Sequence, residues 1–135
     1  MDRYRWDDSL ELDVLEMDRE HKILITYMNE IYNKNKTRES KQEVLSPLNK
    51  LLNYAKHHFS HEESYMESIS YPQLEEHKAV HRDLLMQLES NIKRFSESKD
   101  QHLSDNFFYF LEVWLFSHIR TKDKRYSQFG ENRQP

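Results

Sequence analysis

Two pairs of side chains in this sequence have the spacing and the chemistry of metal ligands. His58 and Glu62 are four residues apart, and so are His77 and His81. On a helix, residues four apart lie on the same face, so the two members of each pair can point toward a common position. Imidazole nitrogens and carboxylate oxygens are both common metal ligands. The sequence therefore predicts that each pair contributes to a metal site.

His118 and Asp123 form a third pair with less regular spacing, because they are five residues apart. Five residues leave two side chains roughly 140° apart around a regular helix that turns about 100° per residue. Both side chains can reach one site only where the helix frays or widens into a π-helical turn. If both bind metal, the helix that carries them is irregular.

His57 and His61 are also four residues apart, so the sequence offers two pairs in the same segment. Helical periodicity places His57 and His61 among mostly polar residues, whereas His58 and Glu62 share a face with apolar residues such as Leu51. We therefore assign His58 and Glu62 to the metal site. The histidines interpreted as solvated are His57, His61 and His102.

Every predicted inner helix face carries at least one histidine. A single buried histidine is more often a hydrogen-bonded core residue than a ligand, but several imidazoles packed with a carboxylate would be very unfavourable without metal. Five nitrogen donors and two carboxylates exceed the needs of one ion, so we predict a dinuclear centre, compatible with iron, zinc, copper or nickel. The predicted ligands are His21, His58, Glu62, His77, His81, His118 and Asp123.

Four amphipathic segments must position these ligands. The apolar periodicity predicts a first helix over residues 18–36 and a second helix that ends near residue 66. It predicts a third helix from the turn after Pro72 to about residue 95, and a fourth over residues 104–126. Segments of about 20 residues joined by short loops predict an all-α, up-down-up-down antiparallel four-helix bundle with an N-terminal arm.

Two helix starts depend on single residues. Asp18 is predicted to be the N-cap of the first helix. For the second helix the sequence leaves two alternatives open: it begins with Ser46 as the cap and Pro47 in the first position, or a longer helix kinks at Pro47.

The composition fits one globular domain. A length of 135 residues is enough for about one domain, and 24 acidic against 20 basic residues give no basic face for nucleic acid. The absence of cysteine excludes a disulfide scaffold and a cysteine nucleophile. The sequence contains neither a signal peptide nor a membrane span, so we expect a cytoplasmic protein. We predict one domain over residues 1–135, with the arm at 1–17, the bundle at 18–126 and a loose tail at 127–135 that includes Gly130 and Pro135.

In order along the chain, a first histidine followed by HxxxE, HxxxH and HxxxxD resembles the ligand pattern of the hemerythrins. The resemblance covers nearly the whole chain and includes Trp6 in the arm, DxxH from Asp18, HFxxEExxM from His58, and DKxY from Asp123. One departure is Glu20, where the family often has glutamine, and we expect it to touch no ligand.

The resemblance implies a non-haem di-iron centre. In such a centre His77, His81 and His118 hold one iron, and His21 and His58 hold the other, which keeps an open position for dioxygen. Glu62 and Asp123 bridge the two ions together with a solvent-derived oxo or hydroxo group. The positions of Leu24, Phe59, Trp114 and Leu115 resemble the family's apolar oxygen pocket, and Tyr109 is expected to help close it.

The function that this resemblance implies is reversible dioxygen binding for storage, transport or delivery, without enzymatic turnover. Two alternatives stay open: a di-iron enzyme that reduces peroxide or nitric oxide, and a module that senses oxygen or iron through an unknown protein partner. A purely structural metal role ranks below these.

Overall fold

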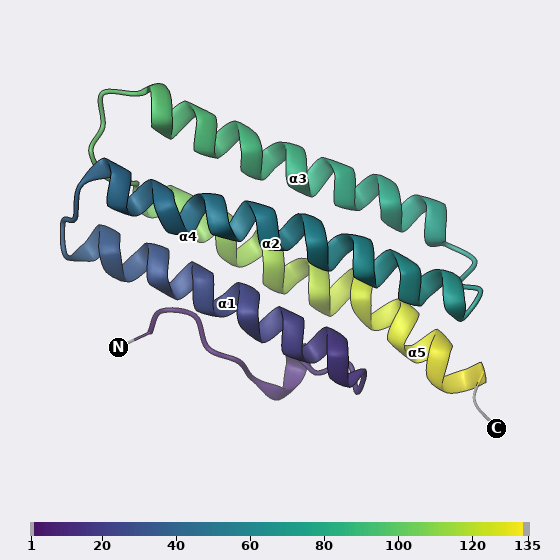
Figure 1. Cartoon of the computed structure of the whole chain (residues 1–135). Helices are drawn as coiled ribbons and strands as arrows, with labels where there is room; N and C mark the ends of the chain where they lie inside the picture. The colour runs from purple at the N-terminus through teal and green to yellow at the C-terminus, as the bar shows by residue number, and fades with distance from the viewer. Residues whose placement is uncertain (1, 134–135) are drawn as a thin grey trace.

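The computed structural model describes residues 2–133 and folds them into a bundle of long antiparallel helices (Figure 1). Figure 1 shows α1, α2 and α3 connected by short turns, with α4 and α5 in line along one further rod. The predicted all-α, up-down-up-down bundle is therefore confirmed. The helices are α1 (Leu15–Lys36), α2 (Lys41–Ser68), α3 (Leu74–Glu97), α4 (Asp105–Glu112) and α5 (Lys124–Arg133).

α1 begins at Leu15, so the prediction that Asp18 is its N-cap is wrong. Val14 occupies the cap position and makes no side-chain cap hydrogen bond. The Asp18 carboxylate instead accepts a hydrogen bond of 2.9 Å from the backbone N–H of Leu12 in the arm. A carboxylate in the first turn also suits the positive end of the helix dipole. Asp18 therefore stabilises the start of α1 and fixes the arm against it.

α2 is one helix from Lys41 onward, so Pro47 lies inside it and does not start it. Ser40 caps this helix, because its hydroxyl accepts a hydrogen bond of 3.2 Å from the backbone N–H of Glu43. Of the two alternatives, the start at Ser46 is thus wrong and the longer helix is present; a kink at Pro47 stays a prediction. Proline in a helix interior removes one backbone hydrogen bond, so other contacts of α2 must offset that loss.

The chain between α4 and α5 remains helical but widens into two π-helical segments. These are η2 (Val113–Ser117) and η3 (Ile119–Asp123). His118 directly precedes η3 and Asp123 ends it, so the irregular helix that their spacing required is present. π-helical turns are uncommon and often occur at functional sites.

The predicted loose tail at residues 127–135 is wrong for its described part, because α5 continues to Arg133. Gly130 is buried, and a Cβ atom at this position would lie 3.1 Å from the hydroxyl of Tyr65. The small residue lets α5 approach α2 closely. Pro135 lies outside the described residues.

The N-terminal arm packs along α1 and reaches α4. The backbone N–H and C=O of Tyr4 pair with the side-chain amide of Asn29 at 2.8 and 2.9 Å. The buried Tyr4 hydroxyl donates a hydrogen bond of 2.8 Å to the carbonyl of Phe108. The arm therefore connects α1 with α4.

The core changes character along the length of the bundle. One half is apolar and includes the fully buried side chains of Met28, Ile31, Leu48 and Leu51. The other half contains buried histidines and carboxylates. Burial of the apolar half provides the favourable free energy that lets the bundle tolerate a polar interior elsewhere. Within residues 2–133, no helix is both long and apolar enough to cross a membrane.

Candidate metal centre

Seven buried polar side chains converge inside the polar half of the bundle. All of them are predicted ligands, and they come from all four helical rods, so the fold brings together residues up to 102 positions apart in the sequence. We call them the seven-residue cluster. Its members are His21 of α1, His58 and Glu62 of α2, His77 and His81 of α3, and His118 and Asp123 beside and within η3.

The two oxygens of Glu62 face different histidines. Oε1 lies 2.9 Å from Nε2 of His81 and 3.8 Å from Nε2 of His77. Oε2 lies 3.5 Å from Nε2 of both His21 and His58. One carboxylate thus stands between two groups of imidazole nitrogens.

Asp123 divides its oxygens in the same way. Oδ1 lies 3.1 Å from Nε2 of both His77 and His118. Oδ2 lies 3.3 Å from Nε2 of His21. The cluster therefore has two halves, one with three histidines and one with two, and each carboxylate presents one oxygen to each half.

These contacts, at 2.9 to 3.8 Å, lie near the spacing of donor atoms that share a metal ion, and they lack the geometry of hydrogen bonds. The five Nε2 atoms, Oε1 of Glu62 and both oxygens of Asp123 are buried without a hydrogen-bond partner. Buried polar groups are rarely left unpaired in this number. Two donor atoms bound to one ion at about 2.1 Å lie roughly 3.0 to 3.4 Å apart, for angles between 90° and the tetrahedral value. The donor set therefore fits a pair of metal ions.

The charges of the cluster favour cations. Burial alone would lower the pKa of His21, yet the adjacent Asp123 and Glu62 carboxylates raise it to about 9. Burial likewise opposes ionisation of Glu62 and Asp123, but the surrounding imidazoles hold the pKa of both carboxyl groups below the ordinary value. Two buried carboxylates thus remain ionised and need positive charge between them.

Two further carboxylates contact the Nδ1 atoms of two cluster histidines, on the side of each ring away from the cluster centre. Nδ1 of His81 lies 2.7 Å from Glu63, and Nδ1 of His58 lies 2.7 Å from Oε1 of Glu20. A carboxylate that accepts the Nδ1 proton leaves the Nε2 lone pair free for a metal ion. The expectation that Glu20 touches no ligand is therefore wrong. Sequence reasoning missed it because Glu20 contacts a histidine of another helix.

The three histidines interpreted as solvated differ in their surroundings. His57 is exposed as predicted. The His61 side chain is 39% exposed, so it contacts solvent, but its Nδ1 also lies 2.6 Å from Oε2 of Glu20, a partner that the sequence did not predict. His102 is also partly buried, at the opposite end of the bundle, and its Nε2 atom has no contact with solvent.

Tyr126 donates a hydrogen bond of 2.5 Å from its hydroxyl to Oε2 of Glu62. The tyrosine is fully buried, and burial next to Glu62 and Asp123 raises the pKa of its hydroxyl well above 10. It therefore keeps its proton and fixes one oxygen of the carboxylate. The DKxY motif contains this residue, but only the fold shows its contact with α2.

Four of the five side chains predicted to form or close an apolar pocket are buried. Phe59 stacks on His81 with ring centres 4.1 Å apart and lies 6.0 Å from the ring of Trp114. Tyr109 does not belong with them, because its side chain is 59% exposed, and its predicted role in closing the pocket is wrong. The four that remain are Leu24, Phe59, Trp114 and Leu115.

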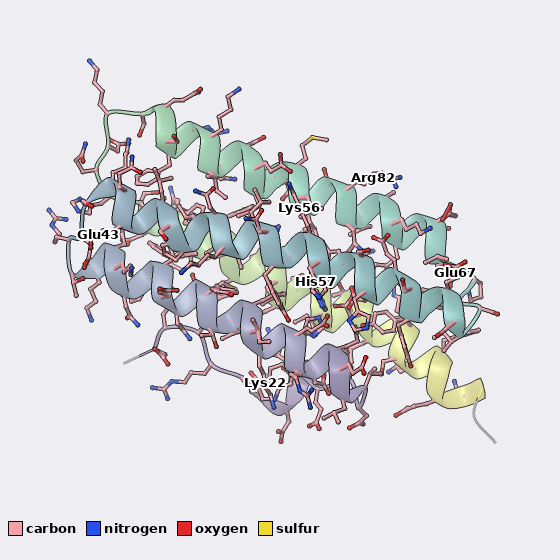
Figure 2. All side chains as sticks on the ribbon, in the orientation of Figure 1. Lys22, Glu43, Lys56, His57, Glu67 and Arg82 are labelled. Atoms are coloured by element: carbon pink, nitrogen blue, oxygen red, sulfur yellow. The ribbon has the colours of Figure 1, made fainter. Side chains whose placement is uncertain are left out.

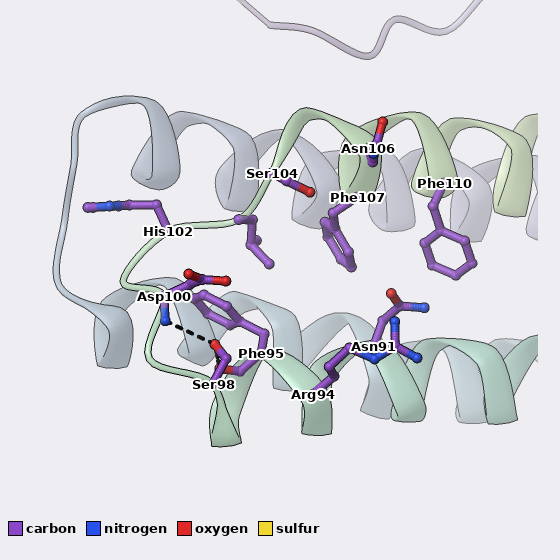
Figure 3. Close-up of a pocket in the computed structure, with 11 residues that line it drawn as sticks. Asn91, Arg94, Phe95, Ser98, Asp100, His102, Ser104, Asn106, Phe107 and Phe110 are labelled. Atoms are coloured by element: carbon purple, nitrogen blue, oxygen red, sulfur yellow. Dashed lines mark hydrogen bonds between the residues drawn. The ribbon is translucent and has the colours of Figure 1, made fainter.

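Two surface hollows show how solvent approaches the bundle. A depression of about 270 Å³ is lined by Val80, Leu84, Trp114 and His118, so it reaches the edge of the cluster. A pocket of about 590 Å³ lies between the end of α3 and the start of α4, with Phe95 and other aromatic side chains around it (Figure 3). This second pocket shares no lining residue with the seven-residue cluster.

Comparison with known proteins finds relatives whose sequences match this chain over most of its length. The family model of the hemerythrin HHE cation binding domain matches residues 13–129, which include the whole cluster. A bacteriohemerythrin of Clostridium acetobutylicum is 34% identical over 125 residues, which cover 90% of this chain and 96% of that protein. A hemerythrin subunit from Sipunculus nudus is 30% identical over 125 residues, which cover 93% of this chain and 92% of that protein.

The fold is similar to that of solved structures over the same extent. A crystal structure of wild-type hemerythrin matches with a TM-score of 0.83 and 25% sequence identity, and the match covers 93% of this chain and 96% of the other. Sequence and fold thus agree on one set of relatives.

Proposed function

Because the chain belongs to the hemerythrin family, we propose that the seven-residue cluster holds two iron ions and that this pair binds dioxygen reversibly. One observation carries the proposal: Glu62 and Asp123 each present one oxygen to the half of the cluster with three histidines and the other oxygen to the half with two. A bridge between two ions requires this division. A single ion would leave several of these buried donor atoms unpaired.

The two halves of the cluster are unequal, and this asymmetry suits a binding centre. In the proposal His77, His81 and His118 would hold one iron, which with the two carboxylates would have five protein donors. His21 and His58 would hold the other iron, which would have four protein donors and therefore more room for an exogenous ligand. When bound, the iron pair would supply and take back the electrons that reversible dioxygen binding requires.

The protein orients these donors before any ion binds. Glu20 and Glu63 each accept the Nδ1 proton of one ligand histidine, and Tyr126 donates to Glu62. These three contacts fix two imidazole rings and one bridging carboxylate. Side chains held in this way keep their metal-binding atoms directed inward, which increases metal affinity.

Apolar side chains limit the access of water to the cluster. We propose that Leu24, Phe59, Trp114 and Leu115 line the oxygen pocket, because all four are buried and Phe59 packs directly on His81. The indole N–H of Trp114 donates a hydrogen bond of 2.9 Å to the carbonyl of Leu84, which fixes the ring between α3 and η2. A dry, apolar pocket admits dioxygen and disfavours charged species and water.

The proposed role is storage, transport or delivery of oxygen in the cytoplasm by a single domain. The test is to measure iron per chain, reduce the protein without air, and record the visible spectrum before oxygen, with oxygen, and after purging. A band that appears with oxygen and disappears on purging supports the proposal. Irreversible oxidation would instead favour an enzyme or a sensor, and a spectrum that does not respond to oxygen would leave a structural site.

A further inference from the structure

Outside the seven-residue cluster, a second group of metal-binding side chains lies on the surface between α1 and α2. His57 and His61 are one turn apart on α2, and their ring centres are 6.3 Å apart. Figure 2 shows His57 projecting from α2. Two imidazoles on one tetrahedral ion have ring centres roughly 5.3 Å apart, for nitrogen–metal bonds of about 2.1 Å. The two rings must therefore move about 1 Å closer, by side-chain rotation, to share an ion.

α1 contributes a third donor to this group. Oε2 of Glu16 lies 3.3 Å from Nε2 of His61, which is within the spacing of two donors on a common ion. The side chains of Glu16 and His61 are 69% and 39% exposed. An ion can therefore reach them from solvent without passing through the bundle.

Glu20 orients His61 for metal binding. It accepts the Nδ1 proton of His61 through Oε2 at 2.6 Å, so Nε2 is the nitrogen that remains for an ion, and Nε2 is the atom that faces Glu16. In many metal sites a carboxylate accepts the proton of one ring nitrogen of a histidine, and the other ring nitrogen binds the metal. Through its other oxygen the same Glu20 holds His58, so it supports both sites.

We propose that His57, His61 and Glu16 form a surface site for one divalent cation, separate from the buried pair of ions. Two imidazoles and one carboxylate suit borderline ions such as Zn²⁺, and helical histidines four residues apart are a recurring zinc-binding arrangement. The three protein donors leave a fourth tetrahedral position for water.

The test is a titration of the iron-loaded, full-length protein with Zn²⁺ by calorimetry, with iron and zinc counted in the same samples after dialysis. We expect one Zn²⁺ per chain in addition to an unchanged iron content. His57→Gln should weaken zinc binding at least tenfold without loss of iron, and Glu16→Gln should weaken it as well. His102→Gln, at the other end of the bundle, is the matched control and should bind zinc as the original chain does.

Two results would overturn the proposal. The first is zinc that binds only as iron is lost, because that zinc occupies the buried cluster. The second is zinc binding of equal strength in the original chain and in the His57→Gln variant.

Discussion

Glu62 and Asp123 are buried carboxylates whose ion-pair partners among the described residues are all imidazoles. No lysine or arginine of the described chain forms an ion pair with them. Two ionised carboxylates in a protein interior are strongly unfavourable unless positive charge lies between them. The imidazoles can supply that charge only by taking up protons, and metal ions supply it while leaving each Nε2 atom as a donor. The cluster is therefore best explained as a site for cations.

The choice of histidine on α2 can be tested at two adjacent positions. His58→Ala removes one of the two histidines on one side of the cluster and leaves Glu20 without its buried partner, so we expect the iron content to fall below two per chain. His57→Ala changes an exposed side chain and should retain both irons and the response to oxygen. Elemental analysis and the visible spectrum measure both effects, and the opposite pattern would show that the assigned register is wrong.

Tyr126→Phe tests whether the hydroxyl group positions the bridging carboxylate. The variant keeps the ring but removes the donor to Glu62, and loss of such a supporting hydrogen bond weakens metal binding by about 10- to 100-fold. We expect the protein still to bind two irons at saturation but to release them at lower concentrations of a competing chelator. Tyr65→Phe is the matched control, and equal chelator sensitivity of the two variants would remove Tyr126 from this role.

At the scale of helices, apolar periodicity predicted most of the buried faces, because the spacing of apolar residues along one helix is a local property. The π-helical turn at η3 could be anticipated only through chemistry, since His118 and Asp123 had to reach one site. The helix ends could not be predicted in the same way. Asp18 has the residue type of an N-cap, but its carboxylate accepts a hydrogen bond from Leu12 of the arm. The segment around Gly130 was expected to be a loose tail, but it is helical and passes close to Tyr65 of α2.

The difference between local patterns and contacts between helices also explains which parts of the site the sequence could predict. The seven cluster residues occur in recognisable motifs, and the hemerythrin resemblance based on them is confirmed by the family model. Their supporting residues are contacts between helices, such as Glu20 of α1 with His58 of α2, and no periodicity marks them. Tyr109 shows the converse error, because helical spacing alone did not reveal that its side chain faces solvent.

Leu115→Ala tests the proposed apolar pocket within η2. Truncation of a buried leucine costs about 2 to 5 kcal/mol and opens a cavity, and a cavity next to the cluster would admit water. We expect the variant to keep its iron and to oxidise faster in air, as followed by the visible spectrum. Leu48→Ala, a truncation in the apolar half of the core, should lose comparable stability without faster oxidation. Equal oxidation rates in both variants would exclude Leu115 from the pocket.

At the scale of the whole molecule, metal binding and folding are coupled. The seven-residue cluster joins all four helical rods, so ions bound there connect helices that are distant in sequence. A ligand that binds only the folded state stabilises it in proportion to the logarithm of its concentration. The bundle without ions must instead hold unpaired donors in its interior, which is unfavourable.

Removal of iron should therefore lower the melting temperature. At 100 times the dissociation constant a ligand contributes about 2.7 kcal/mol, which corresponds to a shift of roughly 8 °C for a domain of this size. Calorimetric scans of the iron-loaded and chelator-treated protein measure this shift. The His58→Ala variant is the control and should respond less to the chelator. An unchanged melting temperature of the original chain would show that the ions do not stabilise the fold.

The central claim is that Glu62 and Asp123 each bridge two ions, and a crystal structure of the iron-loaded protein tests it most directly. Diffraction data collected at the iron absorption edge locate iron atoms independently of the lighter protein atoms. We predict two iron peaks per chain, each in contact with one oxygen of Glu62 and one oxygen of Asp123. A single peak inside the cluster, or two peaks that do not share these carboxylates, would contradict the claim.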